Sequence, residues 1–101
     1  KSTGGLRFKE QAVNLAVIMS IVSSVFDKGI PNDTAFISDV GLTGELKKVP
    51  SLEMRIRELD RRGFKKVYVP RDSVSSNLKF ENIEVVALKT LQEVIKHVFS
   101  T

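Results

Sequence analysis

One stretch constrains the fold of this chain more than any other: residues 35–46, Ala-Phe-Ile-Ser-Asp-Val-Gly-Leu-Thr-Gly-Glu-Leu. An apolar run meets Gly41 and Gly44 there, and a second short run then leads to Val49 and Pro50. Because glycine supplies the backbone angles of tight turns, the pattern predicts a strand, a turn and a returning strand. The alternative, a phosphate-cradling loop, lacks the Gly-Lys-Ser/Thr ending that such a loop requires.

A long apolar helix is predicted before this hairpin, over about residues 10–27. Its residues are apolar nearly all round, so we expect it to be the core helix, buried on several sides. Gly29 is expected to end it, with Pro31 as a further stop.

A charged helix is predicted after the hairpin, over about residues 51–62. Ser51 is its expected N-cap, and Gly63 is its expected C-terminal stop. One narrow apolar stripe follows the spacing i, i+4 and i+7 and consists of Leu52, Ile56 and Leu59.

The rest of the chain alternates strands with one more helix. Residues 66–69 and 83–88 are apolar runs typical of strands, and the polar residues 71–80 between them predict a surface loop. Thr90 and Glu93 have the spacing of a capping box, which opens a last helix that reaches about Phe99. This order favours one domain over residues 1–101, an α/β (α+β) two-layer sandwich.

Composition excludes several classes of site. The 101 residues contain no cysteine and one histidine, His97, so thiolate and multi-histidine metal centres are excluded. No apolar run approaches the roughly 20 residues that a membrane span needs, and we expect a cytoplasmic protein without a membrane partner. His97 lies near the end of the last helix, where its charged form would suit the helix dipole.

Two carboxylates flank the predicted turn, Asp39 and Glu45. An acid/base pair would require them to converge in a pocket with separated pKa values. The alternative is that both are solvated surface groups.

A basic cluster is the most informative charge feature of a chain whose formal net charge is +4. It is interpreted either as a contact surface for the phosphates of DNA or as the solvated face of an amphipathic helix. Glu53–Arg57 and Glu58–Arg62 have i, i+4 spacing and offset part of the charge. The candidate DNA-binding residues are Arg55, Arg57, Arg61, Arg62, Lys65, Lys66 and Arg71.

Several segments resemble, in the same order, the C-terminal domain of the RadA (Sms) family of bacterial DNA repair proteins. They are Gly-Gly-Leu-Arg at residues 4–7, the helix over residues 10–24, Asp-Val-Gly-Leu-Thr-Gly-Glu at 39–45, Gly-Phe-Lys-Lys at 63–66 and Val69-Pro70. That domain is similar to the proteolytic domain of Lon proteases, a two-layer fold of the ribosomal protein S5 domain 2 type. The resemblance implies further strands before the Gly-Gly segment.

Lon proteases use a serine–lysine dyad, in which a neutral lysine takes the serine proton. The matching serine position here is Ala12 or Val13, and the lysine position is Arg55. A guanidinium stays protonated and cannot act as the base. The resemblance therefore implies no catalytic residue and no peptidase activity in this chain.

The resemblance further implies an ATP-dependent motor that acts on branched DNA with the RecA recombinase and assembles as a hexameric ring. ATP, magnesium and zinc are expected only in preceding domains, with no cofactor in this piece, which would contribute DNA binding and ring assembly. Two alternatives stay open: a Lon-like peptidase with a non-standard dyad, for which Ser20, Ser23 and Ser24 would be tested, and a purely structural oligomerisation module.

Overall fold

The structure, a computed structural model, describes residues 13–71, 73 and 80–100. These residues form three helices and six strands. In chain order they are β1 (Val13–Asn14), α1 (Leu15–Phe26), β2 (Thr34–Phe36), β3 (Asp39–Val40), β4 (Leu46–Lys47), α2 (Leu52–Arg61), β5 (Lys66–Pro70), β6 (Glu84–Leu88) and α3 (Leu91–Phe99). The predictions for residues 4–7, for residues 10–12 with Ala12, and for most of the loop 71–80 lie outside the described residues.

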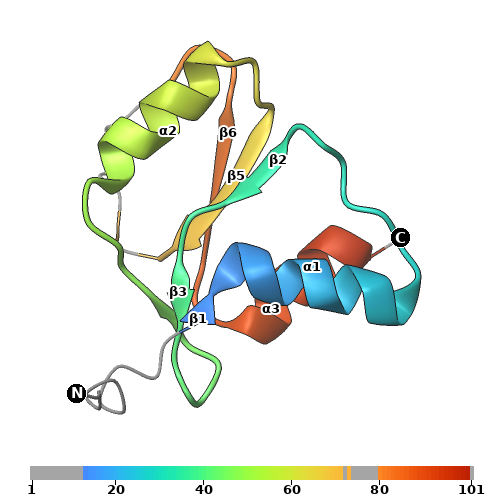
Figure 1. The fold of residues 1–101 in the computed structure, drawn as a ribbon. Coiled ribbons are helices and arrows are strands. Elements are labelled where there is room, and N and C mark those ends of the chain that lie inside the picture. Colours follow the sequence, from blue (N-terminus) through green and yellow to red (C-terminus); the bar gives the residue numbers. More distant parts are fainter. Residues whose placement is uncertain (1–12, 72, 74–79, 101) are drawn as a thin grey trace, which may run out of the picture.

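The strands form two small sheets (Figure 1). The first is parallel, has the order β2-β5-β6, and places Ala35 beside Val67 and Val67 beside Val85. The second is antiparallel, with the order β1-β3-β4. An α/β fold is therefore confirmed.

The predicted hairpin is present, but its first strand is divided. β3 and β4 pair across a turn in which the amide of Gly44 donates to the carbonyl of Gly41 at 3.0 Å, and Gly44 has a φ of 88°. β2, however, belongs to the other sheet. Between β2 and β3, the amide of Ile37 donates to the Tyr68 carbonyl, while the carbonyl of Ser38 accepts from the Leu15 amide. The chain thus changes sheets at Ile37 and Ser38.

Helices cover both faces of the parallel sheet, which makes three layers where two are predicted (Figure 1). Val67 and Val69 of β5 face the core beneath α2. Tyr68, which lies between them, faces the core made with α1 and α3. The alternation of side chains along a strand explains how one strand serves both cores.

The apolar helix differs from its prediction. It begins at Leu15, after β1, because the Asn14 side chain accepts from the Ala16 amide at 2.8 Å. It ends at Asp27, whose left-handed backbone (φ 56°) forms the C-cap, and not at Gly29.

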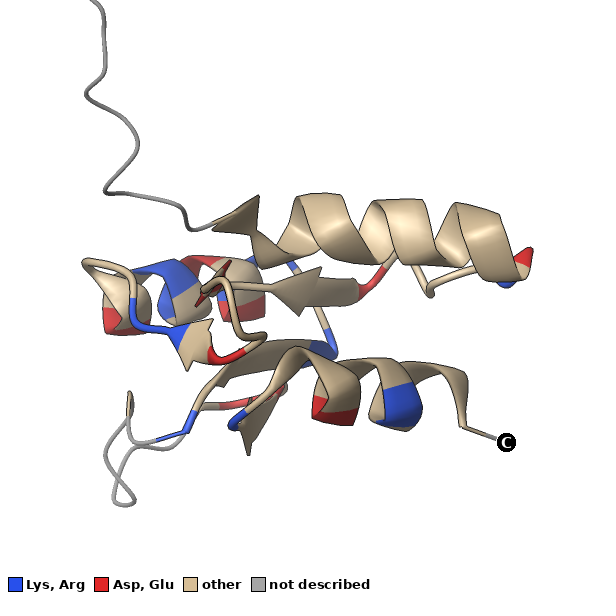
Figure 2. Ribbon diagram, turned by 90° about the horizontal axis from the view of Figure 1, so that it is seen from below, with Lys and Arg blue, Asp and Glu red and all other residues tan. Residues whose placement is uncertain are grey.

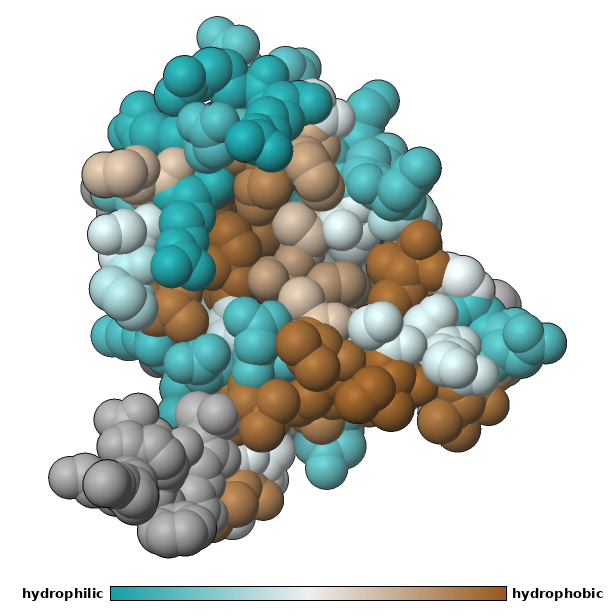
Figure 3. Space-filling view, viewed as in Figure 1, coloured by the Kyte–Doolittle hydropathy of each residue, from teal (hydrophilic) through white to brown (hydrophobic). Residues whose placement is uncertain are grey.

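Burial of α1 on several sides is a wrong prediction. Only Leu15 and Met19 of this helix are fully buried. Val17, Ile21 and Val25 are 52%, 59% and 73% exposed, and Figure 3 shows brown surface along the helix. The described elements pack against only one side of α1. None of the described helices has the length and hydropathy needed to cross a bilayer.

The other two helices follow their sequence signals, except at the predicted N-cap of α2. α2 buries Leu52 and Ile56, but Ser51 has left-handed backbone and its side chain makes no capping hydrogen bond. Gly63 follows with a φ of 94°, as expected of a helix stop. In α3 the capping box of Thr90 and Glu93 is complete.

Candidate nucleic-acid interface

The predicted interface is built on α2. Leu52 and Ile56 hold one side of this helix against the parallel sheet. Figure 2 shows the charged positions of this helix as blue and red bands, and all of them except the half-buried Asp60 are exposed. The amphipathic pattern therefore presents arginines outward, as the sequence predicts.

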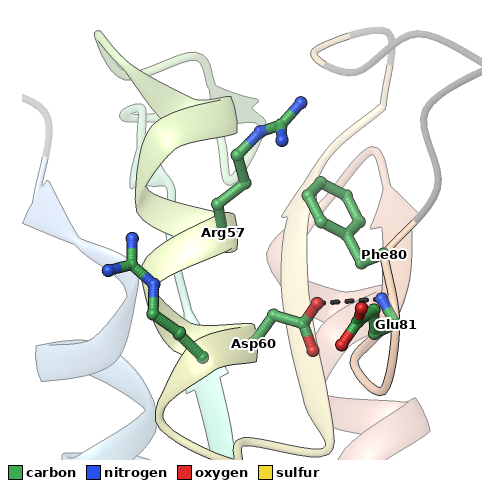
Figure 4. A pocket seen from close by; sticks show the side chains of 5 residues that line it. Arg57, Asp60, Phe80 and Glu81 are labelled. Atoms are coloured by element: carbon green, nitrogen blue, oxygen red, sulfur yellow. Dashed lines mark hydrogen bonds between the residues drawn. The ribbon is translucent and has the colours of Figure 1, made fainter.

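The arginines do not form one patch. Arg55 and Arg62 lie on the side of α2 that faces β2, beside Ala35. Arg57 and Arg61 lie on the opposite side, where they line a cavity with Phe80 (Figure 4). Successive residues of a helix are rotated by about 100°, so residues two apart, such as Arg55 and Arg57, lie on nearly opposite sides.

Most of these cations have a carboxylate neighbour. Arg57 lies 3.0 Å from Glu53, and Glu58 lies 3.5 Å from Arg61 and 3.2 Å from Arg62. These pairs are exposed, so each contributes about 0–1 kcal/mol and leaves the guanidinium free to exchange partners. A phosphate group can therefore compete for them.

Three further cations complete the predicted set. Lys66 lies 4.0 Å from Glu84, its neighbour on β6. Lys65 directly precedes β5, whereas Arg71 follows the strand at its other end. The structure therefore groups Lys65 and Lys66 at one end of β5 and separates Arg71 from them.

Asp60 is a structural residue that the sequence does not reveal. Its carboxylate accepts hydrogen bonds from the backbone amides of Glu81, Asn82 and Ile83, at 2.9, 3.0 and 3.2 Å. Figure 4 shows it directed at the segment that leads into β6. These hydrogen bonds anchor α2 to the segment before β6. The amides lie more than 20 residues after Asp60 in the sequence, so no local pattern predicts the contact.

The carboxylates of the hairpin do not resemble an acid/base pair. Glu45 accepts from the Thr43 hydroxyl and lies 3.9 Å from the Lys47 amine. The Thr43 hydrogen bond is the main reason that the pKa of Glu45 lies below its usual range. A general acid requires the opposite shift. Asp39 lies opposite Lys47 in the β3–β4 ladder.

His97 makes a defined contact with the core. Its Nδ1 lies 2.7 Å from the hydroxyl of Tyr68, which is buried and stacks on Phe36. Burial raises the pKa of Tyr68, with a smaller effect from Glu84. The contact ties the imidazole of α3 to the buried ring of β5 through a hydrogen bond.

Two of the positions that the resemblance to Lon proteases assigns to a serine–lysine dyad lie in the part of the chain that the structure describes. Val13 lies in β1 with 48% of its surface exposed, and Arg55 lies on α2. Ser23 donates to the Lys28 carbonyl, and Ser38 donates to the carbonyls of Asp39 and Lys47. Within residues 13–71, 73 and 80–100, no three potential metal ligands gather.

Fold and surface together define a small α/β domain with a charged, arginine-bearing helix on one face. No family model matches the chain. A DNA repair protein RadA from Streptococcus pneumoniae is 41% identical over 100 residues, 99% of this chain and 24% of that protein. Proteins of the same name from Aquifex aeolicus and Listeria monocytogenes are 36% and 35% identical over 96 residues, 95% of this chain and 21% of each protein.

The chain belongs to the RadA family, and it spans about a quarter of the length of the curated relatives that it matches. The resemblance to RadA proteins is therefore confirmed, whereas the resemblance to Lon proteases stays a prediction.

Proposed function

We propose that this chain is a non-proteolytic, Lon-like module of a cytoplasmic DNA repair and recombination ATPase, and that it contributes DNA binding and ring assembly. The observation that carries the proposal is the match of nearly the whole chain to proteins named for DNA repair. DNA is accordingly the first partner to test.

The surface of α2 supports a DNA contact of moderate strength. The three arginines of the helix are balanced by Glu53, Glu58 and Asp60, and Arg62 at its C-cap adds one net positive charge. Lys65 and Lys66 extend the cationic surface beyond it. Little aromatic surface accompanies these groups, which favours contact with the phosphate backbone over base stacking.

Binding of labelled duplex DNA, measured by fluorescence anisotropy across a salt series, tests the DNA role. Replacing Arg61 and Arg62 with alanine should reduce the slope of log K against log[salt] by about 0.9 for each phosphate that these side chains neutralise. Replacing Lys28 and Lys96 is the matched control, since these cations lie at the end of α1 and on α3. Absent or salt-independent binding would remove the DNA role.

The Lon-like fold and the absence of peptidase activity form a separate part of the proposal. Degradation of casein by the parent chain, abolished by changing Ser20, Ser23 or Ser24 to alanine, would contradict it. Our expectation is that none of these proteins cleaves casein, because a guanidinium at residue 55 cannot accept a proton.

Ring assembly and the RecA partnership are proposals for the longer protein. Native mass measurement of the full-length protein should show a hexamer, and pull-down should recover RecA. Assembly without any DNA binding would favour the purely structural alternative.

A further inference from the structure

A groove of about 490 Å³ separates α2 from β2. Ala35 and Ile37 line it from the β2 side, and Met54 and Leu59 line it from the helix. Figure 3 shows this apolar surface in the hollow between the hydrophilic surface of α2 and the hydrophobic surface of α1. Met54 is 69% exposed, and its flexible thioether suits side chains of varied shape.

The groove runs beside an unpaired sheet edge. β2 is the outer strand of the order β2-β5-β6, and within the described residues no strand pairs with its other side. The amide of Ile37 donates to the Tyr68 carbonyl of β5. Backbone groups alternate between the two sides of a strand, so the N–H and C=O of Phe36 face away from β5. Free edges of this kind accept extended peptides by strand addition.

Charge at the rim indicates the kind of peptide. Arg55, Glu58 and Arg62 all line the groove. Glu58 is paired with Arg61 and Arg62, whereas Arg55 forms no ion pair with any carboxylate in the described part of the chain. A carboxylate on the incoming segment would complement this guanidinium, which forms strong charge-assisted hydrogen bonds.

We propose that the groove between α2 and β2 binds an extended segment of a partner protein that alternates apolar and acidic side chains toward α2. Ala35 and Ile37 face the α2 side, and Phe36 faces the other. An added strand would therefore direct every second side chain into the groove. The proposal goes beyond DNA binding, although Arg55 and Arg62 belong to both surfaces.

An apolar groove favours peptide over DNA, because a phosphate backbone brings no apolar group to fill it. The probe is therefore a fluorescein-labelled peptide, Leu-Thr-Glu-Thr-Leu-Thr-Glu, with leucine and glutamate on one face. The control peptide carries lysine in place of both glutamates. Anisotropy titration should show the glutamate peptide binding at least about tenfold more tightly than the lysine peptide.

Met54→Ser and Lys65→Glu separate the groove from the DNA surface, and Arg55→Glu tests the charge at the rim. Met54→Ser leaves the charge unchanged and should weaken peptide binding several-fold without altering DNA binding. Arg55→Glu should weaken peptide binding about tenfold, whereas Lys65→Glu, a charge reversal outside the groove, should affect DNA alone. The Phe36 amide should become protected from hydrogen exchange when the peptide is bound.

Equal binding of both peptides, or no binding at millimolar concentration, would overturn the proposal. So would peptide binding that is indifferent to Met54→Ser, or a Phe36 amide that stays unprotected. DNA binding that falls with Met54→Ser while the peptide does not bind would assign the groove to DNA instead.

Discussion

The helices α1 and α2 have opposite compositions and similar burial. α1 contains no charged residue, whereas α2 contains six in ten positions. Each nevertheless has two buried side chains, Leu15 and Met19 in α1 and Leu52 and Ile56 in α2. Hydrophobic composition thus limits what a helix can bury, and the elements packed against it decide what it does bury.

The largest expected effect contrasts one isoleucine on each helix. Ile56→Ala removes a side chain with no exposed surface and should lower the free energy of unfolding by about 2–5 kcal/mol. Ile21→Ala removes one that is 59% exposed and should cost about 0.5 kcal/mol or less. Urea denaturation of both variants makes the comparison. Equal losses of stability would mean that the outer side of α1 is buried in solution.

A second prediction concerns the polar anchoring of α2. Asp60→Ala leaves three backbone amides without their acceptor and should destabilise the protein by about 1–3 kcal/mol in urea denaturation. Glu53→Ala is the matched control on the same helix, since it removes only an exposed ion pair worth about 1 kcal/mol or less. If Glu53→Ala lowered stability as much as Asp60→Ala, the loss would come from removing any negative charge from α2, and not from losing the hydrogen bonds of Asp60.

Helix caps give a smaller contrast. Thr90→Ala removes the hydroxyl that accepts from the Glu93 amide, and should cost about 1 kcal/mol in thermal or urea unfolding. Ser51→Ala should change stability by about 0.5 kcal/mol or less, because Ser51 makes no side-chain cap. If the two variants were equally unstable, Ser51 would have to cap α2 in solution.

The smallest effect is a pH dependence at the start of α3. Backbone amides of Lys89 and Thr90 donate to Glu93 and lower its pKa below the ordinary value of 4.5. The carboxylate therefore adds stability above about pH 4.5, and this contribution disappears as the pH falls through the lower pKa of the folded state. Urea midpoints of the parent and of Glu93→Gln should differ at pH 7 and converge toward pH 3. A constant difference would contradict the hydrogen-bond assignment.

Local signals predicted most of the local features, although α1 ends at Asp27 and not at Gly29, and the Ser51 side chain does not cap α2. The capping box at Thr90, the stop at Gly63 and the turn between Gly41 and Gly44 depend on residues within one turn of each other, and all are present. The change of sheet at Ile37 and Ser38 has no such signal, since its partners are Tyr68 and Leu15. Periodicity likewise cannot say whether a neighbour covers the outer side of α1.

The candidate site was likewise predictable only in its local features. Its cations were identified from the sequence, and the division of Arg55 and Arg62 from Arg57 and Arg61 follows from helical spacing once the side of Leu52 is fixed. The groove and the Asp60 anchor were not predictable, because β2 and the segment before β6 approach α2 only in the folded chain.

The passage of one chain segment from β2 into β3 makes the two sheets inseparable. Ile37 donates to the parallel sheet, and Ser38 accepts from Leu15 beside the antiparallel sheet, on consecutive residues. Neither sheet can open without pulling on the same two peptide groups. The domain should therefore unfold as one cooperative unit, with amides of β3 and β5 exchanging their hydrogens through a common opening event.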